Sequence, residues 1–144
     1  MIELEKAGIN IVKTYITKKS SPLSLLSIAR QHNWGGVVIK PRVSAAAWNT
    51  HFVKKPNLQK KESLFQELVQ KYDMMVQPFQ ENIISFGEIS LMMVNGVLTH
   101  AVLKRAKYGD FRVQDDFGGS VEPYVPTKDQ IVFAENVLQK IPFN

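Results

Sequence analysis

The sequence contains no cysteine and no apolar run near the roughly 20 residues that a membrane span needs. The absence of cysteine excludes disulfides, iron–sulfur clusters, thiolate zinc sites and cysteine nucleophiles. The three histidines, at positions 32, 51 and 100, lie too far apart in the sequence to indicate a zinc cluster. The N-terminus lacks the basic flank and apolar segment of a signal peptide. We therefore expect a cytoplasmic protein with no membrane partner.

Several nucleotide-binding motifs are also missing. There is no Walker A sequence and no dinucleotide glycine fingerprint. Val38-Ile39-Lys40 and Asp116-Phe117-Gly118 spell two short strings of protein kinases. However, no glycine-rich loop precedes Lys40, no His-Arg-Asp loop precedes Asp116, and the chain is too short for two kinase lobes. These absences argue against a kinase.

The composition is that of an ordinary globular protein with an excess of positive charge. The 144 residues are 44% hydrophobic and 22% charged, which predicts one domain or a close pair of small lobes. A net charge of +5 indicates an anionic partner, such as nucleic acid, a membrane surface or a nucleotide phosphate. Nucleic-acid platforms interleave aromatic with basic residues, whereas Phe52 and Phe65, the aromatics nearest the lysines at 54–61, fit a strand and a helix. Nucleic acid is therefore the less favoured partner.

The first half of the sequence alternates between helical and strand patterns. Apolar spacing predicts a helix over Pro22–Gln31, capped by Ser20 or Ser21. The remaining elements that we expect are a strand at Val37–Ile39 that closes at Lys40-Pro41, a strand at Thr50–Lys54, an amphipathic helix at Leu58–Val69 and a buried strand at Met74–Val76.

The second half begins with a hairpin. Strand-like runs at Glu88–Val94 and Val97–Leu103 flank Asn95-Gly96, which favours a type I′ turn. The polar stretch Arg105–Ser120 predicts a long functional loop that orders over a bound ligand. Thr127–Lys140 is helical in its spacing, with Thr127 as its cap. This order of elements, which begins with a strand ahead of the first helix, predicts two α+β lobes that meet near Gln77-Pro78-Phe79.

Three segments have the chemistry of a nucleotide site. Lys40 ends a buried strand, where its ammonium group could reach phosphate oxygens. Ser44-Ala45-Ala46-Ala47 is a run of small residues that would let backbone amides approach a phosphate closely. The strand at Met74–Val76 runs into Gln77-Pro78-Phe79-Gln80, which could supply an apolar slot and an exposed backbone edge for adenine.

Taken together and in order, these segments resemble the ATP-grasp superfamily, and most of all its branch of bacterial glutathione synthetase-like and D-cycloserine-biosynthesis-type ligases. The resemblance rests on Val37-Val38-Ile39-Lys40-Pro41, Ser44-Ala45-Ala46, Met75-Val76-Gln77-Pro78-Phe79, Gly87-Glu88-Ile89-Ser90-Leu91, Gly96, His100-Ala101-Val102 with Lys104, and Gly109-Asp110-Phe111-Arg112-Val113-Gln114 with Gly118-Gly119. It implies an α+β fold whose two lobes clasp ATP with Mg²⁺. It also implies a carboxylate–amine ligase that activates an acid as an acyl phosphate.

The resemblance implies roles for the residues at the junction of the lobes. In Gln77-Pro78-Phe79-Gln80, the side chain of Gln77 would lie near the adenine amino group, and the backbone of Gln80 would donate to the ring. Glu88 resembles the carboxylate that binds the ribose hydroxyls, and Glu81 is a second candidate for that role.

The resemblance also implies which residues contact phosphate. Lys40, with Ser44 and Ala45, would hold the nucleotide phosphates. Lys104 and Arg112 would be catalytic, because they would neutralise either the transferring phosphoryl group or the substrate carboxylate.

The sequence departs from the family pattern at both ends. We interpret residues 1–20 as a remnant of a preceding lobe and a linker, residues 21–77 as the small lobe, and residues 78–144 as a second lobe that stops before the metal-binding strands. The magnesium ligands are accordingly expected outside this chain, and no metal ligand is assigned within it. The acids of this lobe, Asp110, Asp115, Asp116, Glu122 and Glu135, are expected to be solvated.

The expected partners are ATP and small carboxylate and amine substrates. An uncovered sheet edge near Val94 and Val97 would also favour homo-oligomers. Two other functions stay open, namely a catalytically incompetent nucleotide-binding or interaction module and a basic nucleic-acid-binding domain. Steep salt dependence of oligonucleotide binding would indicate the latter.

We predict that this chain alone binds nucleotide without turning it over. Phosphoryl transfer needs metal ions that bridge the phosphates, and the residues that would hold them are expected beyond Asn144. ADP release, measured with magnesium and a panel of amino acids, should stay at the background rate. A robust amine-dependent rate would contradict the prediction.

Overall fold

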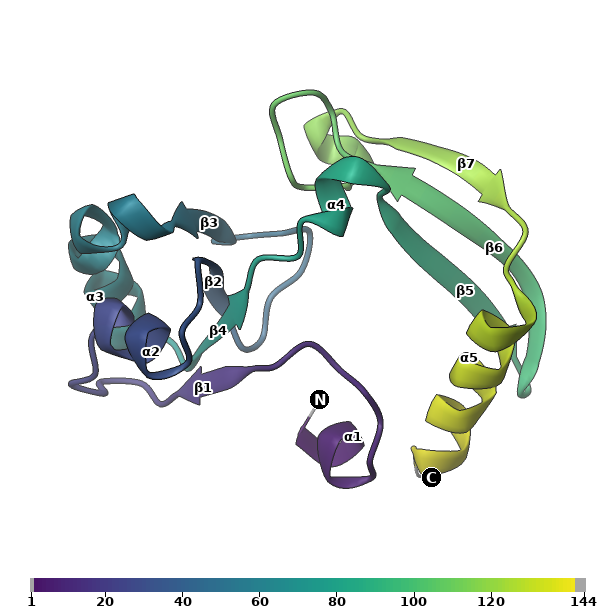
Figure 1. Cartoon of the computed structure of the whole chain (residues 1–144), viewed down its shortest axis with the longest axis horizontal. Coiled ribbons are helices and arrows are strands. Elements are labelled where there is room, and N and C mark those ends of the chain that lie inside the picture. Colours follow the sequence, from purple (N-terminus) through teal and green to yellow (C-terminus); the bar gives the residue numbers. More distant parts are fainter. Residues whose placement is uncertain (1, 142–144) are drawn as a thin grey trace. The chain divides into compact units, whose positions relative to one another are not determined.

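The computed structural model describes residues 2–141, which form two compact units (Figure 1). The four-stranded unit comprises Val12–Gln80. The three-stranded unit comprises the described residues up to Ile11 together with those from Glu81 onward. Each unit contains its own antiparallel sheet and its own helices, so the predicted α+β class is confirmed.

The sheet of the four-stranded unit has the order β1-β4-β2-β3, and each neighbouring pair is antiparallel. Its elements are β1 (Tyr15–Thr17), α2 (Leu25–Gln31), β2 (Gly36–Pro41), β3 (His51–Lys54), the 3₁₀ turns η1 (Lys55–Asn57) and η2 (Gln59–Lys61), α3 (Glu62–Lys71) and β4 (Met74–Pro78).

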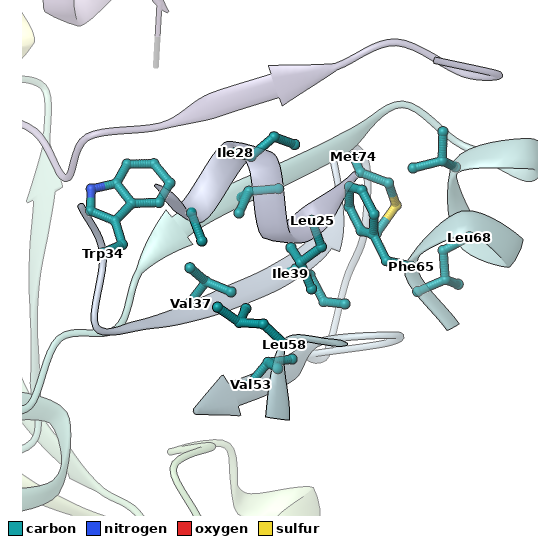
Figure 2. Close-up of a cluster of buried hydrophobic side chains, with 13 residues drawn as sticks. Leu25, Ile28, Trp34, Val37, Ile39, Val53, Leu58, Phe65, Leu68 and Met74 are labelled. Atoms are coloured by element: carbon teal, nitrogen blue, oxygen red, sulfur yellow. The ribbon is translucent and has the colours of Figure 1, made fainter. Parts of the chain in front are cut away.

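One face of this sheet is sealed by a hydrophobic core. Burial alternates along β2, with Val37 and Ile39 fully buried, because successive side chains of a strand point to opposite faces. Helices α2 and α3 add apolar side chains such as Leu25, Ile28 and Phe65 to the same cluster (Figure 2). Full burial of such a side chain stabilises the fold by about 1.5–3 kcal/mol. The core therefore determines which face of the sheet remains for other contacts.

A carboxylate from one helix caps the other helix of this unit. Glu62, at the start of α3, accepts hydrogen bonds from the backbone amides of Leu25 and Leu26 at 3.2 and 3.4 Å. Ser24 caps the same helix end by accepting from the amide of Ser27 at 3.0 Å. The first amides of a helix lack partners within it and carry partial positive charge, so both contacts are favourable. They join α2 and α3 independently of the apolar core.

The three-stranded unit has the sheet order β5-β6-β7. Its elements are α1 (Ile2–Lys6), α4 (Asn82–Ser85), β5 (Glu88–Val94), β6 (Val97–Arg105), η3 (Asp115–Phe117), β7 (Ser120–Tyr124) and α5 (Lys128–Lys140).

Local sequence signals determine two features of this unit. Asn95 and Gly96 both have positive φ, as the predicted type I′ hairpin requires, and β5 pairs with β6 around them. Thr127 caps α5 through a reciprocal capping box with Gln130. The predicted hairpin and C-terminal helix are therefore confirmed.

The apolar packing of this unit is sparse. Its buried hydrophobic residues are Ala101, Leu103 and Val113, and α5 has no buried residue. An apolar groove of about 560 Å³ runs between β5 and α5, lined among others by Leu91 and Phe133. Main-chain pairing between the strands consequently carries more of the stability here than in the four-stranded unit.

Several boundaries differ from the sequence predictions. The cap of α2 is Ser24 and not Ser20 or Ser21, and Ser20 instead has a positive φ. The predicted helix 58–69 begins as the 3₁₀ turn η2, and regular α-helix starts only at Glu62. Propensity patterns do not separate a 3₁₀ turn from the first turn of an α-helix.

Other elements were not predicted at all. Strand β7 and the short helix α4 are too short for a periodic signal, and β7 contains Pro123, which is tolerated because β7 is an edge strand. The expected irregular loop 105–120 contains η3 and the buried Val113. Strand β1, the strand expected ahead of the first helix, lies within residues 1–20 and pairs with β4. The predicted lobe boundaries, at residues 1–20, 21–77 and 78–144, stay a prediction. Pro142, which the sequence predicts as the end of the C-terminal helix, lies outside the described residues.

We predict that Phe65→Ala destabilises the four-stranded unit by about 3–5 kcal/mol, because the ring is fully buried and its loss leaves a cavity. Both tryptophans of the sequence, Trp34 and Trp48, belong to this unit. Urea unfolding followed by tryptophan fluorescence therefore reports on it. The matched control is Phe133→Ala on α5, where the ring is 46% exposed, and its effect should stay within about 0.5 kcal/mol. Equal effects of the two substitutions would contradict the prediction.

Candidate functional site

The face of the four-stranded sheet opposite the core presents Lys40. Strand alternation places Val38 and Lys40 on this face, since Val37 and Ile39 point into the core. The register with β4 sets Val38 opposite Gln77 and Lys40 opposite Met75. We call this surface the open face. It brings together Lys40, which was predicted to bind phosphate, and Gln77, which was predicted to bind adenine, on neighbouring strands.

Gln77 is a buried polar residue whose orientation is determined by a neighbour. Its side chain lies on β4 and is 8% exposed. Its Nε2 donates to Oγ1 of Thr14 at 2.8 Å, and that hydroxyl donates to the carbonyl of Val12, also at 2.8 Å. The contact between Nε2 and Thr14 fixes which end of the amide is the oxygen, and an amide oxygen accepts from donors such as an amino group.

At the end of β4, the segment predicted to join the lobes, Gln77-Pro78-Phe79-Gln80, continues the sheet by one more backbone hydrogen bond, and we call this segment the hinge. The amide of Phe79 donates to the carbonyl of Gly36 at 2.9 Å. The Phe79 ring stacks on Phe52 of β3, with ring centroids 3.8 Å apart and an interplanar angle of 17°. A Cβ on Gly36 would lie 3.0 Å from the Phe52 ring. Glycine at position 36 thus permits the stack, and the stack forms a flat apolar wall beside the hinge.

The loop between β2 and β3 adopts a backbone conformation that favours glycine. Ala46 and Ala47 have φ of 48° and 53°, in the left-handed region that costs a non-glycine residue roughly 1–2 kcal/mol. Ser44 helps to hold the loop, because its hydroxyl donates to the carbonyl of Trp48 at 2.8 Å. Ser44 and Ala45, both predicted phosphate contacts, are exposed here.

In the three-stranded unit, two of the predicted residues form an ion pair. Glu88 of β5 lies directly opposite Lys104 of β6, and Lys104 Nζ is 3.6 Å from Glu88 Oε1. Both side chains are partly exposed, so the pair contributes little to stability. Alternation places them on the sheet face opposite Ile89 and Leu91, which line the groove to α5. The predicted ribose carboxylate and one predicted catalytic lysine are therefore neighbours.

Arg112, the other predicted catalytic residue, is tightly held within its loop. Its Nη2 lies 2.7 Å from Oδ2 of Asp110, and its Nε lies 3.1 Å from Oδ1. The guanidinium carbon lies 3.6 Å from the centre of the Phe117 ring. Hydrogen bonds from the Arg112 side chain hold the pKa of Asp110 well below its usual range. The expectation that Asp110 is a solvated acid is therefore wrong. Glu122 is exposed as expected, and its carboxylate accepts from Nε of Arg105 at 3.0 Å.

The predicted site residues divide between the two units. The four-stranded unit contains the predicted phosphate and adenine contacts, namely Lys40, Ser44, Ala45 and Gln77-Pro78-Phe79-Gln80. The three-stranded unit contains the predicted ribose and catalytic residues, namely Glu81, Glu88, Lys104 and Arg112. Gln80 and Glu81 are exposed, and Glu81 is the residue that precedes α4.

Four residues that touch predicted site residues were missed by sequence reasoning: Thr14, Phe52, Asp110 and Phe117. The Asp-x-Arg spacing at 110–112 was a usable signal, since aspartate commonly accepts from backbone amides one and two residues on. The other three contacts depend on sheet pairing or on the fold of the loop, and no local pattern indicates them.

Within residues 2–141, no three histidine, aspartate or glutamate side chains gather into a group that could hold a metal ion. None of the helices in that range is long and apolar enough to cross a membrane.

Solved structures share this fold. The structure of D-cycloserine synthetase DcsG matches with a TM-score of 0.80 at 19% identity, over 96% of this chain and 48% of that chain. D-alanine–D-alanine ligase from Bacillus anthracis matches with a TM-score of 0.68 at 12% identity, over 96% and 46%. The ATP-grasp ligase PsnB, in a complex with a minimal precursor, Mg and ADP, matches with a TM-score of 0.64 at 12% identity, over 96% and 39%. The fold is that of ATP-grasp ligases, and the chain spans less than half the length of these three proteins.

The sequence itself identifies the family. Residues 5–142 match the family described as prokaryotic glutathione synthetase, ATP-grasp domain. The chain belongs to this family, and the predicted resemblance is confirmed. A comparison with curated proteins gives no match.

We predict that Ala46→Gly stabilises the four-stranded unit by about 1 kcal/mol, because glycine adopts positive φ without the steric cost that alanine has there. Ala45→Gly is the matched control. It adds the same flexibility to the unfolded chain at a neighbouring position where no positive φ is found, so it should destabilise by about 0.4–1 kcal/mol. Urea unfolding followed by tryptophan fluorescence measures both, and destabilisation by Ala46→Gly would contradict the strained loop.

Proposed function

We propose that this chain is the ATP-binding part of a carboxylate–amine ligase that acts through an acyl phosphate. The observation that supports this most is that Lys40 and Gln77 share the open face, on the neighbouring strands β2 and β4, within a chain that belongs to an ATP-grasp family. A cation and an oriented amide on adjacent strands suit the two ends of a nucleotide, its phosphates and its base.

The base would bind along the hinge. The amide oxygen of Gln77, oriented through Thr14, would accept from the adenine amino group. The backbone at Gln80 would donate to the adenine ring, and the stacked rings of Phe52 and Phe79 would supply an apolar wall. Glu88, or alternatively Glu81, would accept from the ribose hydroxyls.

The phosphates would bind to Lys40 and to backbone amides at Ser44 and Ala45. These amides lie in a loop whose left-handed turn at Ala46 and Ala47 resembles the conformation that glycine supplies in phosphate-binding loops. Lysine offers three donors on a flexible stem, so Lys40 can follow phosphate oxygens from the strand.

In the proposed reaction, ATP supplies the phosphoryl group that activates a carboxylate. Lys104 and Arg112 would neutralise the charge that develops on the transferring group or hold the substrate carboxylate. Residues 2–141 present no three-ligand acidic group, so we assign no step to magnesium within this chain. The small acid and amine that would be joined belong to the proposal only as chemical classes.

We predict that Lys40→Ala weakens ATP binding about tenfold, because a charge-assisted contact to phosphate contributes about 1.5–3 kcal/mol. Calorimetry with ATP measures the change. The matched control is Lys60→Ala, which removes the same charge from the exposed 3₁₀ turn η2. Lys60→Ala should bind ATP as the unaltered chain does. Equal losses in the two variants would indicate a general charge effect and would contradict the phosphate role of Lys40.

A further inference from the structure

Arg112 is restrained by Asp110 along one of its two hydrogen-bonding edges. Nε and Nη2 form the side of the guanidinium that faces Asp110, at 3.1 Å to Oδ1 and 2.7 Å to Oδ2. A guanidinium has five N–H donors, and a two-point pair with one carboxylate uses two of them. Three donors remain, two on Nη1 and one on Nη2. They lie along the outer edge of the group, in the geometry that binds an oxyanion at two points.

The carboxylate that holds Arg112 is itself held in place. Oδ1 of Asp110 accepts from the backbone amide of Phe111 at 2.7 Å and from that of Arg112 at 3.0 Å. The carboxylate is therefore tied to the same short stretch of backbone that carries the arginine. Its pKa is held below the usual range, chiefly by the side chain of Arg112, so it stays charged at neutral pH.

The face of the guanidinium is also covered. The Phe117 ring lies beneath it at 3.6 Å, in cation–π geometry. Phe117 belongs to η3, which is anchored by the amides of Phe117 and Gly119, both donating to the carbonyl of Gln114. Val113, next to Arg112, is 3% exposed and anchors the backbone. The flexible side chain of Arg112 is thus restrained at one edge by Asp110, on one face by Phe117 and through its backbone by the buried Val113.

We propose that Asp110 is a positioning residue, which together with Phe117 presents the outer Nη1–Nη2 edge of Arg112 as a preformed fork for an oxyanion, phosphoryl or carboxylate. This inference rests on the proposed function only for the identity of that anion. The side chain of Arg112 is 31% exposed, and among residues 2–141 its Nη1 has no hydrogen-bond partner.

The proposal predicts the direction in which Asp110→Asn changes the affinity for an anion. Asp110 and Arg112 together are formally neutral, so loss of the Asp110 charge raises the net positive charge beside the fork. If charge alone governed anion binding, Asp110→Asn would tighten it. If positioning governs it, Asp110→Asn weakens it, because an unrestrained arginine loses more rotamer freedom when it binds.

Nuclear magnetic resonance of the ¹⁵N-labelled full chain tests this through the Nε–H signal of Arg112, which Arg112→Lys identifies by its loss. The probes are tripolyphosphate and succinate, which carry neither base nor ribose and separate phosphoryl from carboxylate recognition. The signal should be protected from exchange and should shift with at least one probe. Asp110→Asn should lose the protection and bind that probe about fivefold more weakly, a loss somewhat below that of a whole charged contact. This loss should persist at high salt, where charge effects are screened.

The matched control is Asp116→Asn. It removes the same charge from the same loop, at an exposed residue outside the contacts of Arg112. It should leave both the protected signal and the affinity unchanged. Equal or tighter binding by Asp110→Asn, identical behaviour of the two asparagine variants, or an Nε–H signal that neither probe shifts would each overturn the positioning role.

The same titrations with ATP separate this inference from the proposed function. If tripolyphosphate shifts Arg112 but ATP does not bind, the fork stands and the nucleotide proposal fails. If ATP binds while neither probe shifts the Arg112 signal, the nucleotide proposal stands and the fork fails.

Discussion

The pairing of β2 with β4 is the constraint on which the candidate nucleotide surface depends. In this register Ile39 lies opposite Val76 and Lys40 lies opposite Met75, so the two strands point their apolar residues to the same side. A slip of one residue would exchange the faces and place the Lys40 ammonium in the core, at a large cost for an unpaired buried charge. Burial of Val37, Ile39 and Val76 therefore places Lys40 and Gln77 on the same face of the sheet.

The two units reach stability by different means. In the four-stranded unit, two helices seal one sheet face, and Glu62 adds polar capping between them. In the three-stranded unit, the strands pair over long ladders, while α5 contributes no buried side chain. Elements with few buried contacts open locally at lower free energy. The hairpin and α5 are consequently the parts of the described chain where we expect early hydrogen exchange.

Charge in the three-stranded unit is arranged in pairs before any ligand binds. Glu88 faces Lys104, and Asp110 holds Arg112. Such ion pairs reduce the net positive potential near Lys104 and Arg112, but they also restrain the direction in which the two cations point. Catalysis benefits from groups that are oriented in advance, since no reorganisation is then needed when charge develops.

Local signals in the sequence determined the hairpin at Asn95-Gly96, the capped helix from Thr127, the strand that contains Lys40 and, through a series of short motifs in order, the ATP-grasp family. These follow from turn chemistry, capping and hydrophobic period, which act over a few residues. Only the tertiary structure decided that Thr14 orients Gln77, that Phe52 stacks on Phe79, that β1 pairs with β4 and that strand β7 exists. Edge strands form because a partner offers unpaired backbone groups, and contacts across a sheet depend on register. Neither the pairing partner nor the register can be read from a short stretch of sequence, because both arise only when distant segments pair.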